Sequence, residues 1–567
     1  MWKHLLSGGL KVEQQNASAK KLILSVLNST ATKREARDYL TKYTRSDDSK
    51  QLNHCLLLIR HLNSLRQHEI SELTSTVKKL GMLGLRPIFV IPPSRHIAKQ
   101  AEILDIITTL AGFRPLQLQN SLSQSIDGTY TSILSSQNAI LNNHELEVVP
   151  ILKPYVYREK DASEFLTNDF TKFMQNLCKG NNTHIDKFFI LNRIGGIPSN
   201  ERNENSHVFV NLSQEYDCLK KDLKGQVDLL IERRPRTESL LHKLELHLNE
   251  DAINTLENQF KEHLQDLEMM NVVLSNLSSS ATGLITTIES AASSSEKKNP
   301  LIYNILTDRS LISSSLPRFK KIRHTPPSGS RPAKKFHRMT YLEDYQQLDK
   351  SSPPDSALVT TVFKKGIDIK IFDYPKLTQF NSLSLPVEFR VKDSPQTNPL
   401  HKIDLSKLKG LIDRSFKRSL NLNHYLHRIN GNIASIIVIG DYDGIAILTN
   451  EGPNDNPFVY LDKFAISPEM KGSLCISDII FNLMVKKFPK ELLWRSRNDN
   501  VVNKWYFQRS VGVLDLSIDL GDGNQTKSNF NLFYYGEPKS TNYGFHNLAR
   551  LKEYAKHIRD IHPSWDK

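Results

Sequence analysis

The segment with the most chemical content is Trp494–Phe507, which contains two arginines, three asparagines and a Trp-Tyr-Phe triplet. A short apolar run predicts a strand over Leu492–Arg497. Side chains alternate along a strand, so Arg495 and Arg497 are predicted to share a face. Two adjacent guanidinium groups repel each other unless anions lie between them, and arginine pairs carboxylates through two parallel hydrogen bonds. The pattern indicates a dicarboxylate site, and an edge strand with two solvated arginines explains the composition equally well.

A lysine in a neighbouring strand strengthens the anion hypothesis. Lys463 lies within the otherwise apolar stretch of a predicted strand, Val459–Ile466. An ion pair with Asp462 is the simpler explanation, but successive side chains of a strand point to opposite faces, which makes that pair unfavourable. Lys463 is therefore predicted to bind the same anion as the arginines.

Tyr506 is the candidate general acid. It follows the asparagine-rich turn, and a phenol near a departing thiolate can supply the proton that the leaving group needs. Anchoring the core by its ring is the more common role of a tyrosine, so only the neighbouring residues favour catalysis. Cys475 is a weaker candidate, as an acyl-accepting nucleophile, because no histidine accompanies it locally.

The connection Lys471–Ser477 is a candidate phosphate-binding element. It leads into a helix predicted over Ile476–Lys487, and free backbone N–H groups at a helix start can bind the pyrophosphate of coenzyme A. The signal is weak by itself, because a single glycine before a helix is common.

The elements that must position these residues alternate between strands and helices. A strand pattern within Val362–Phe372 precedes a helix over Leu405–Leu420. Further strands are predicted over Ala434–Ile439, Gly444–Leu448, Val459–Ile466, Leu492–Arg497 and Asn531–Tyr535, with the helix Ile476–Lys487 among them. The order indicates a mixed sheet with helices.

The first half of the chain has a different pattern. Its short apolar runs predict strands over Arg86–Pro92, Leu146–Leu152, Phe188–Leu191 and Val208–Leu212. Helices are predicted over Asp47–Gly84, Ile97–Leu110 and Ala162–Leu177, with one or two long helices over Glu238–Leu277. This alternation favours an open α/β sheet with parallel strands. Gly195-Gly196 is a lone glycine pair, which does not make a convincing nucleotide-binding loop.

Length, composition and net charge limit the possible classes of protein. The chain has 567 residues, 39% of them hydrophobic, and a net charge of +14, which suggests several domains and an anionic partner or a basic targeting segment. The four cysteines form no CxxC pair, which argues against a zinc site and for a reducing compartment. No apolar run is long enough for a membrane span. Metal and nucleic acid are not expected partners.

Two basic segments flank the first half. The N-terminal segment up to Arg34 contains one acidic residue, Glu13, and six basic ones. This composition is typical of a mitochondrial presequence, although an ordinary basic first helix is the alternative. Ser313–Ala357 is rich in proline, serine and basic residues, which indicates a linker. A nucleic-acid-binding tail is less favoured, because aromatic residues are not interleaved.

The motifs resemble those of the N-acetylglutamate synthases, and the fungal mitochondrial members most of all. Trp494–Phe507 meets the family pattern Trp-Arg-Ser-Arg-x-x-Asn-x-x-Asn-x-Trp-Tyr-Phe in full, and Leu461–Phe464 meets Leu-Asp-Lys-Phe. Weaker similarities lie at Asn192–Pro198, Ser280–Thr287, Asn299–Arg309 and Leu311–Pro317. The resemblance covers most of the chain beyond the presequence.

The resemblance implies a fold class and a domain order. The fold is α/β, with an amino-acid-kinase-like open sheet followed by a GNAT-type acetyltransferase domain whose splayed sheet admits a pantetheine arm. The corresponding ranges are a presequence and disordered N-terminus over 1–45, a regulatory domain over 46–315, a linker over 316–357 and an acetyltransferase domain over 358–567. The kinase-like domain of this chain has no convincing glycine-rich nucleotide loop, so regulation and assembly, without kinase activity, are its expected roles.

The resemblance also implies roles for individual residues. Lys463, Arg495 and Arg497 would hold the carboxylates of L-glutamate, Asn500 would lie beside the reacting amine, and Tyr506 would protonate the thiolate. The acetyl-CoA-binding residues would be Phe464, Ala465 and Ile466 through their main chain and Lys471, Gly472, Ser473, Leu474, Cys475 and Ile476 around the pyrophosphate. The chain departs from the usual loop, Gln/Arg-x-x-Gly-x-Gly/Ala, with Lys471, Leu474 and Ile476 at those offsets, which leaves coenzyme affinity open.

The implied activity is the synthesis of N-acetyl-L-glutamate from L-glutamate and acetyl-CoA, which opens arginine biosynthesis. Acetyl-CoA would be a co-substrate, with no permanently bound cofactor and no metal. L-Arginine would inhibit through the first domain, in the mitochondrial matrix, within a homo-oligomer and a complex with acetylglutamate kinase. The alternatives are an amino-acid kinase, for which no phosphate loop is found, and a catalytically silent regulatory subunit of an acetylglutamate kinase complex.

Overall fold

The computed structural model describes most of the chain beyond its first 52 residues. The described ranges are 53–136, 147–179, 184–199, 205–232, 240–278, 280–293, 299–312, 356–373, 388–391, 401–453, 457–468, 476–520, 528–536 and 548–566. The expected presequence over 1–45 lies outside them, as does nearly all of the expected linker over 316–357. The described residues fall into two compact units that divide between Gly366 and Ile367, with 53–312 and 356–366 in the first.

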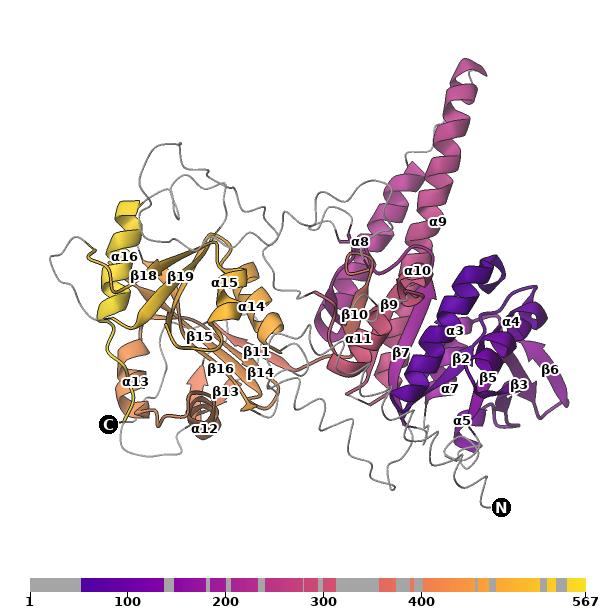
Figure 1. The fold of residues 1–567 in the computed structure, drawn as a ribbon, viewed down its shortest axis with the longest axis horizontal. Coiled ribbons are helices and arrows are strands. Elements are labelled where there is room, and N and C mark those ends of the chain that lie inside the picture. Colours follow the sequence, from indigo (N-terminus) through magenta and orange to yellow (C-terminus); the bar gives the residue numbers. More distant parts are fainter. Residues whose placement is uncertain are drawn as a thin grey trace, which may run out of the picture. The chain divides into compact units, whose positions relative to one another are not determined.

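The first unit is a sheet covered by helices on both faces (Figure 1). Its strand order is β4-β3-β5-β2-β1-β7-β9-β10-β8, with β6 paired to β5. The strands are β1 (Asn53–Ile59), β2 (Leu85–Val90), β3 (Arg114–Gln124), β4 (Tyr130–Ser132), β5 (Val148–Arg158), β6 (Ser163–Leu166), β7 (Ile185–Asn192), β8 (Phe209–Asn211), β9 (Thr282–Thr287) and β10 (Thr361–Lys364). The ladders from β3 through β5, β2, β1 and β7 to β9 are parallel, which confirms the expected parallel sheet.

Two hydrophobic cores lie on opposite faces of this sheet. Along β1, Cys55, Leu57 and Ile59 belong to one core, whereas Leu56 and Leu58 belong to the other. The first core takes its helices from α3 (Gln67–Met82), α4 (Ile97–Leu110), α10 (Ile288–Ala291) and α11 (Pro300–Thr307), and the second from α7 (Phe170–Cys178), α8 (Leu212–Glu232) and α9 (Leu240–Asn276). A short 3₁₀ turn, η1 (Leu62–Ser64), and α5 (Ile133–Ser136) complete the unit.

Burial on both faces explains the wrong prediction of a helix over Asp47–Gly84. Residues 54–59 of β1 are all buried, so the strand reads as a continuous apolar run whose period cannot be told from that of a buried helix. The helix begins only at Gln67. The prediction over Ala162–Leu177 was likewise partly wrong, because β6 occupies its beginning and α7 its end.

The first sheet extends past residue 358, where the acetyltransferase domain was expected to begin. β10 pairs antiparallel with β9 and parallel with β8 in the first sheet, and Val362 and Phe363 are fully buried there, in opposite cores. The sequence of a short apolar strand does not show which sheet the strand joins. Only the pairing with β8 and β9 shows that β10 belongs to the first sheet. The second unit therefore begins at Ile367.

The second unit contains a seven-stranded sheet in the order β11-β14-β15-β16-β17-β19-β18. Its strands are β11 (Ile369–Phe372), β14 (Ile433–Ile439), β15 (Gly444–Glu451), β16 (Phe458–Ile466), β17 (Glu491–Arg497), β18 (Gly512–Asp515) and β19 (Phe530–Gly536), beside a hairpin of β12 (Glu388–Val391) and β13 (His401–Asp404). The helices are α12 (Leu405–Phe416), α13 (Leu422–Ile429), α14 (Ile476–Lys487), α15 (Asn503–Arg509) and α16 (Leu548–Asp560).

The centre of this sheet is splayed. β16 and β17 run parallel but form a ladder at a single pair, Tyr460 with Leu493, whereas β15 pairs with β16 from Gly444 to Glu451. Beyond Tyr460, the edge of β16 that faces β17 is thus open in the part of the chain that the structure describes. The predicted strands of this unit and the exact span of α14 are confirmed, while α13, α15 and α16 were not predicted.

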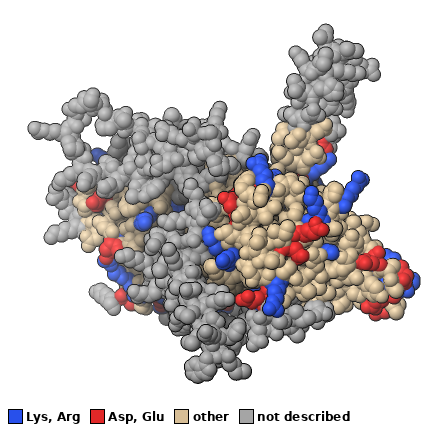
Figure 2. All heavy atoms as spheres, turned by 45° about the vertical axis from the view of Figure 1, so that its right-hand side comes forward, with Lys and Arg blue, Asp and Glu red and all other residues tan. Residues whose placement is uncertain are grey.

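The surface and the polar clusters of the described residues show three further properties. Basic and acidic side chains are interspersed on the face in Figure 2, so its described part presents no single-sign field. No group of three or more His, Cys, Asp or Glu side chains in the described ranges could hold a metal ion. None of the helices described is both long and apolar enough to cross a membrane.

Candidate active site

A β-bulge in β16 shapes the surroundings of Lys463. Ile447 of β15 pairs with Lys463 and the next residue, Leu448, pairs with Leu461, which leaves Asp462 as an extra residue. A bulge breaks the strict alternation of side chains. The Nζ of Lys463 consequently lies 2.8 Å from Oδ2 of Asp462. The ion pair between Lys463 and Asp462, which regular strand geometry made unfavourable, is therefore present. That prediction was wrong because the strand is not regular at this point.

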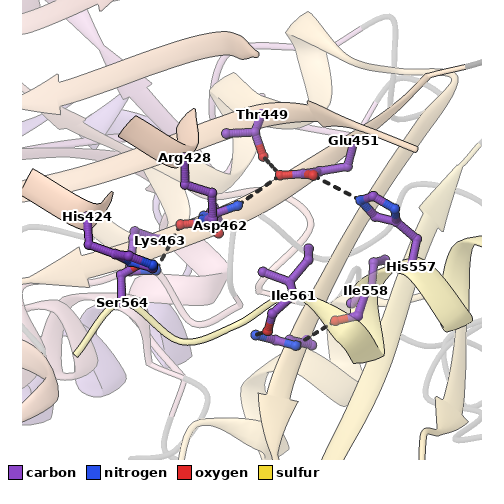
Figure 3. A network of polar contacts seen from close by, with 11 residues as sticks. His424, Arg428, Thr449, Glu451, Asp462, Lys463, His557, Ile558, Ile561 and Ser564 are labelled. Carbon is purple, nitrogen blue, oxygen red and sulfur yellow. Dashed lines mark hydrogen bonds and ion pairs between the residues drawn. The ribbon is translucent and has the colours of Figure 1, made fainter. Parts of the chain in front are cut away.

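Asp462 is the centre of a buried ionic network (Figure 3). Its side chain is 3% exposed and also pairs with the guanidinium of Arg428 from α13. Arg428 donates to Oε1 of Glu451 at 3.1 Å, and the other carboxylate oxygen of Glu451 lies 3.0 Å from Nε2 of His557. Burial would raise the pKa of Asp462, but the charges of Lys463 and Arg428 outweigh it and lower that pKa to about 2. Asp462 is thus a carboxylate shared by two cations.

The ammonium of Lys463 lies against two aromatic rings. Its Nζ is 4.7 Å from the ring centre of Tyr425 and 5.6 Å from that of Trp565. Ring faces carry negative potential and attract a cation at these distances. Burial lowers the pKa of Lys463, and the adjacent Asp462 carboxylate opposes that shift. The lysine is fixed in place rather than extended into solvent.

Arg495 is held by neutral carbonyl groups. Its Nη1 donates to the carbonyl oxygen of Ile558 at 2.5 Å, and its Nη2 donates to that of Ile561 at 2.8 Å. Both acceptors lie at the end of α16, where helix carbonyls lack partners within the helix and attract a cation. The guanidinium also lies 5.0 Å from the ring centre of Phe530. Within the described ranges, no carboxylate pairs with Arg495, so its positive charge is not neutralised.

Arg497 has different surroundings. Its Nε and Nη2 donate to the two carboxylate oxygens of Asp499 at 3.0 and 2.9 Å. The side chains of Arg497 and Asp499 are 45% and 70% exposed. An exposed pair of this kind contributes little stability and exchanges readily for another anion. The expected pair of equivalent arginines is thus one half-buried cation and one solvent-facing cation.

The turn after β17 is tied down by asparagines. The Nδ2 of Asn500 donates to Oγ of Ser496 at 2.9 Å, and its Oδ1 accepts from the backbone N–H of Val502 at 3.2 Å. Asn503 donates to the carbonyl oxygen of Arg497 at 2.7 Å. These bonds connect β17, the strand that carries Arg495 and Arg497, to α15, the helix that carries Tyr506.

Tyr506 is a buried residue with an aromatic environment. It is 8% exposed, and its ring centre lies 5.6 Å from that of Trp494 and 5.4 Å from that of Phe533. Burial raises the pKa of Tyr506 above its usual value of 10. The phenol therefore carries its proton at neutral pH, as a proton donor must, and the raised pKa makes it a weaker acid than a solvated tyrosine. The packing role and the acid role are compatible in this position.

The predicted coenzyme-binding residues are described in part. Phe464, Ala465 and Ile466 lie on β16 beyond its one pair with β17, and the Phe464 ring stacks on Trp505 at 5.9 Å. Lys471 to Cys475 lie outside the described residues. Ile476 begins α14, and a Cβ on Gly444 would approach its Cγ2 to 2.7 Å. The glycine therefore allows the start of α14 to pack closely on β15.

Four residues that shape this site were missed: Tyr425, Arg428, Trp565 and Arg509. Arg509, only 1% exposed, donates to Asp478 in the first turn of α14 at 2.9 Å. The sequence does contain a signal for α13: an asparagine, Asn421, followed by apolar residues at helical spacing. In the structure, the Asn421 side chain caps the helix by accepting from the N–H of His424. No local pattern indicates the partners of Trp565 or Arg509.

The carboxyl ends of the parallel strands in the first unit carry a separate ionic cluster. Arg193, after β7, donates to both oxygens of Glu69 at 2.5 and 3.0 Å and to Glu289 at 2.8 Å. Arg60, after β1, pairs with Asp266 at 2.6 Å. Ligands of open α/β sheets usually bind at this edge. Here its arginines are already paired with carboxylates of the chain itself.

The glycine pair after β7 is also engaged within the chain. Gly195 donates its N–H to Asn192, and Gly196 donates to the carbonyl oxygen of Val359. A Cβ on Gly195 would lie 2.8 Å from the Val359 oxygen, and one on Gly196 would overlap Thr361. The N–H groups of both glycines are used by the chain itself, so this segment is built for packing rather than for cradling a phosphate.

Comparisons with known proteins relate the sequence of this chain to acetyltransferases. Residues 392–561 match the family model of the N-acetyltransferase of N-acetylglutamate synthase. The mitochondrial amino-acid acetyltransferase of Saccharomyces cerevisiae YJM789 is 55% identical over 100% of this chain and 99% of its own length, and that of Kluyveromyces lactis is 49% identical with the same coverage. The structure of N-acetylglutamate synthase from Neisseria gonorrhoeae with coenzyme A and L-arginine matches at 11% identity and TM-score 0.32, over 89% of this chain and 98% of its own.

Proposed function

Because this chain belongs to the family of mitochondrial amino-acid acetyltransferases, we propose that it transfers the acetyl group of acetyl-CoA to the amino group of L-glutamate. The products are N-acetyl-L-glutamate and coenzyme A, and the reaction opens arginine biosynthesis. The observation that carries the proposal is the charge balance of the site. Lys463 and Arg428 are paired with two carboxylates, Asp462 and Glu451, whereas Arg495 is held by backbone carbonyl oxygens and keeps its positive charge among the described residues. A dicarboxylic amino acid supplies the missing negative charge.

The substrate carboxylates are assigned to Lys463, Arg495 and Arg497. Arg495 and Lys463 are already oriented by contacts with the chain, so little side-chain entropy is lost when an anion binds. Arg497 reaches the substrate by exchanging its exposed partner Asp499. Asn500, on the same turn, lies near the reacting amine and orients it.

Acetyl-CoA is assigned to the splayed centre of the sheet. The open edge of β16 at Phe464–Ile466 supplies backbone hydrogen-bonding groups to the pantetheine amides, as an added strand would. The pyrophosphate is assigned to the segment from Lys471 to Ile476, where Lys471 compensates by charge for the missing glycines. No metal and no covalent enzyme intermediate take part in the proposed reaction.

Transfer is proposed to be direct. The neutral amine of glutamate attacks the thioester carbonyl carbon, the C–N bond forms, and the C–S bond breaks. A base or a water near Asn500 accepts the proton of the amine, and the Tyr506 hydroxyl gives its proton to the departing thiolate. Tyr506 then regains a proton from solvent, which restores the enzyme.

The first unit is proposed to regulate this reaction. L-Arginine, the product of the pathway, would bind it and inhibit acetyl transfer. Its sheet edge is closed by the chain's own ion pairs and the N–H groups of its glycine pair are already used, which supports regulation and assembly over amino-acid kinase activity. Homo-oligomer formation and a complex with acetylglutamate kinase are further parts of this proposal.

The relatives matched over almost their whole length are mitochondrial by name, and this protein is mitochondrial as well. We place it in the matrix, because the N-terminal composition is that of a matrix presequence. We assign the regulatory role to the first unit, which ends at Gly366, and the acetyltransferase role to the second unit, which begins at Ile367; the division into two compact units supports this assignment.

Release of coenzyme A from acetyl-CoA tests the activity. We expect release by the full chain to depend on L-glutamate, to be much slower with D-glutamate or L-glutamine, and to fall when L-arginine is added. The Tyr506→Phe variant is the control for contaminating activity. A chain without glutamate-dependent release that still changed the arginine sensitivity of an acetylglutamate kinase would be the silent regulatory subunit instead.

A further inference from the structure

The last described residues of the chain, Ile561–Asp566, form a tail that is fastened to the second unit. Ser564 accepts from the backbone N–H of Asn421 at 3.0 Å through its carbonyl oxygen, and its hydroxyl lies 3.0 Å from Nδ1 of His424. The N–H of Asp566 donates to the carbonyl oxygen of Ser419 at 2.9 Å, and its carboxylate accepts from the Ser419 hydroxyl at 2.6 Å. Polar contacts on both sides of Trp565 therefore fix the course of the backbone at that residue.

Trp565 connects this tail to a substrate-binding cation. Its ring centre lies 5.2 Å from that of Phe416 and 5.6 Å from the Nζ of Lys463. A lysine side chain has four rotatable bonds, so its ammonium needs surrounding groups to hold it in one position. Tyr425 and Asp462 supply two of these groups from the body of the unit, and Trp565 supplies the third from the tail.

The beginning of the same segment holds a second substrate-binding cation. The carbonyl oxygens of Ile558 and Ile561 accept from Arg495, as described above. These acceptors lie 63 and 66 residues further along the chain. Figure 3 shows Ile558, Ile561 and Ser564 along one side of the network that contains Lys463. One continuous C-terminal segment thus contacts both of the proposed glutamate-binding cations that are not solvent-facing, Lys463 and Arg495.

We propose that the C-terminal segment Ile558–Trp565 is a positioning element of the glutamate site, which sets the places of Lys463 and Arg495 without touching the substrate. The inference rests on the proposed function, because it takes these two cations as glutamate ligands. Its consequence is specific: a change in the tail alters glutamate binding and leaves the acetyl-CoA site on the open edge of β16 intact. A tail that merely added stability would change neither Michaelis constant selectively.

Three variants of Trp565 in the full chain test this inference. Trp565→Ala removes the ring, Trp565→Leu keeps apolar bulk against Phe416 but has no ring face for the ammonium, and Trp565→Phe restores a ring. We expect the glutamate KM to rise about tenfold in the Ala and Leu variants and to return toward the wild-type value in the Phe variant. The acetyl-CoA KM and the kcat should change little. Lys552→Ala is the matched control, since Lys552 is exposed on α16 outside the segment Ile558–Trp565 and the variant should behave as wild type.

Several results would overturn the inference. They are an unchanged glutamate KM in Trp565→Ala, an equal rise of both Michaelis constants, and a Leu variant as active as the Phe variant. If Trp565→Ala does not fold, the comparison of the Leu and Phe variants still decides the question. Failure of the proposed function would look different, because the wild-type chain itself would then release no coenzyme A in response to glutamate.

Discussion

Arg193 and Arg60 of the first unit and Arg495 of the second unit are held by opposite kinds of partner. In the first unit, Arg193 lies between Glu69 and Glu289, and Arg60 pairs with Asp266. In the second unit, Arg495 is held by the carbonyl oxygens of Ile558 and Ile561. Carboxylates cancel the charge of an arginine, whereas carbonyl groups orient the guanidinium and leave its charge in place. The first arrangement leaves the arginines neutralised, and the second leaves a positive charge that fits the anionic ligand proposed above.

The difference separates a structural cluster from a binding site without reference to any relative. Both clusters are rich in charge and both contain buried acidic groups, so charge content alone does not distinguish them. The balance of charge does, because an arginine neutralised by two carboxylates has no need of a ligand. The predictions below test this distinction in order of decreasing effect.

The largest effect is expected from Tyr506→Phe, which tests whether the chemistry belongs to the second unit alone. The change removes one hydroxyl and keeps the ring packing on Trp494 and Phe533. General acid catalysis contributes about 10²–10⁴-fold, so kcat should fall by that factor with little change in either KM or in the melting temperature. The loss should shrink with a thioester of a more acidic thiol, which needs less protonation. Wild-type turnover with lower stability would make Tyr506 a packing residue.

The second prediction concerns Arg193 in the ionic cluster of the first unit. Arg193→Met leaves the carboxylate of Glu69, which is 2% exposed, without its guanidinium partner. Breaking a buried pair costs about 3–5 kcal/mol, so the unfolding free energy of the first unit should fall by that amount. Denaturant titration measures it. Lys172→Met, which removes an exposed pair with Asp169, is the control and should cost less than about 1 kcal/mol. A raised glutamate KM in Arg193→Met would contradict the comparison.

The same pair predicts a dependence of stability on pH. The hydrogen bond from Arg193 lowers the pKa of Glu69 from 4.5 to about 2. A lowered pKa in the folded state means that the pair stabilises fully above pH 4.5 and that this contribution is lost as the pH falls toward 2. The wild-type first unit should therefore lose more stability than Arg193→Met over this range. Melting temperatures measured between pH 5 and pH 2 would show the difference, and parallel curves would refute it.

The next prediction concerns the cations of the proposed glutamate site. Lys463→Ala and Arg497→Ala each remove a charge-assisted contact, which costs about 1.5–3 kcal/mol and raises the glutamate KM roughly ten- to hundredfold. The acetyl-CoA KM should change far less. Steady-state kinetics with each substrate varied in turn provides the measurement. An unchanged glutamate KM in both variants would remove the carboxylate assignment.

The smallest effect is expected from Asp499→Asn, which frees Arg497 from its exposed partner. Exposed pairs are worth up to about 1 kcal/mol, so the glutamate KM should fall by no more than about fivefold. Added salt should reduce the difference, because the charges are screened. Asp161→Asn frees the exposed Arg158 of the first unit in the same way and should leave the glutamate KM unchanged. A higher KM in Asp499→Asn would show that Asp499 orients Arg497 for binding.

Local sequence patterns predicted the elements well where the pattern has a clear period and clear ends. The spans of α4 and α14 match the predicted helices residue for residue, and β17 with its two arginines lies where the apolar run indicated. The residue types in Trp494–Phe507 also predicted an anion site, which stays a prediction. These conclusions depend on side-chain chemistry and on spacings of a few residues, which a single stretch of sequence contains.

What only the tertiary structure decided concerns partners that are remote in the chain or irregular in geometry. The β-bulge at Asp462 allows Asp462 to pair with Lys463 at the centre of the ionic network, although a regular strand would separate the two side chains. The sequence of β16 does not reveal the bulge, because the register depends on the neighbouring strand β15. β10 joined the first sheet although it follows β9 by more than seventy residues. The two arginines that looked alike in sequence differ because Ile558 and Ile561 reach Arg495 and Asp499 reaches Arg497. Residue type determines which charges the chain carries, but packing decides which of them remain available to a ligand.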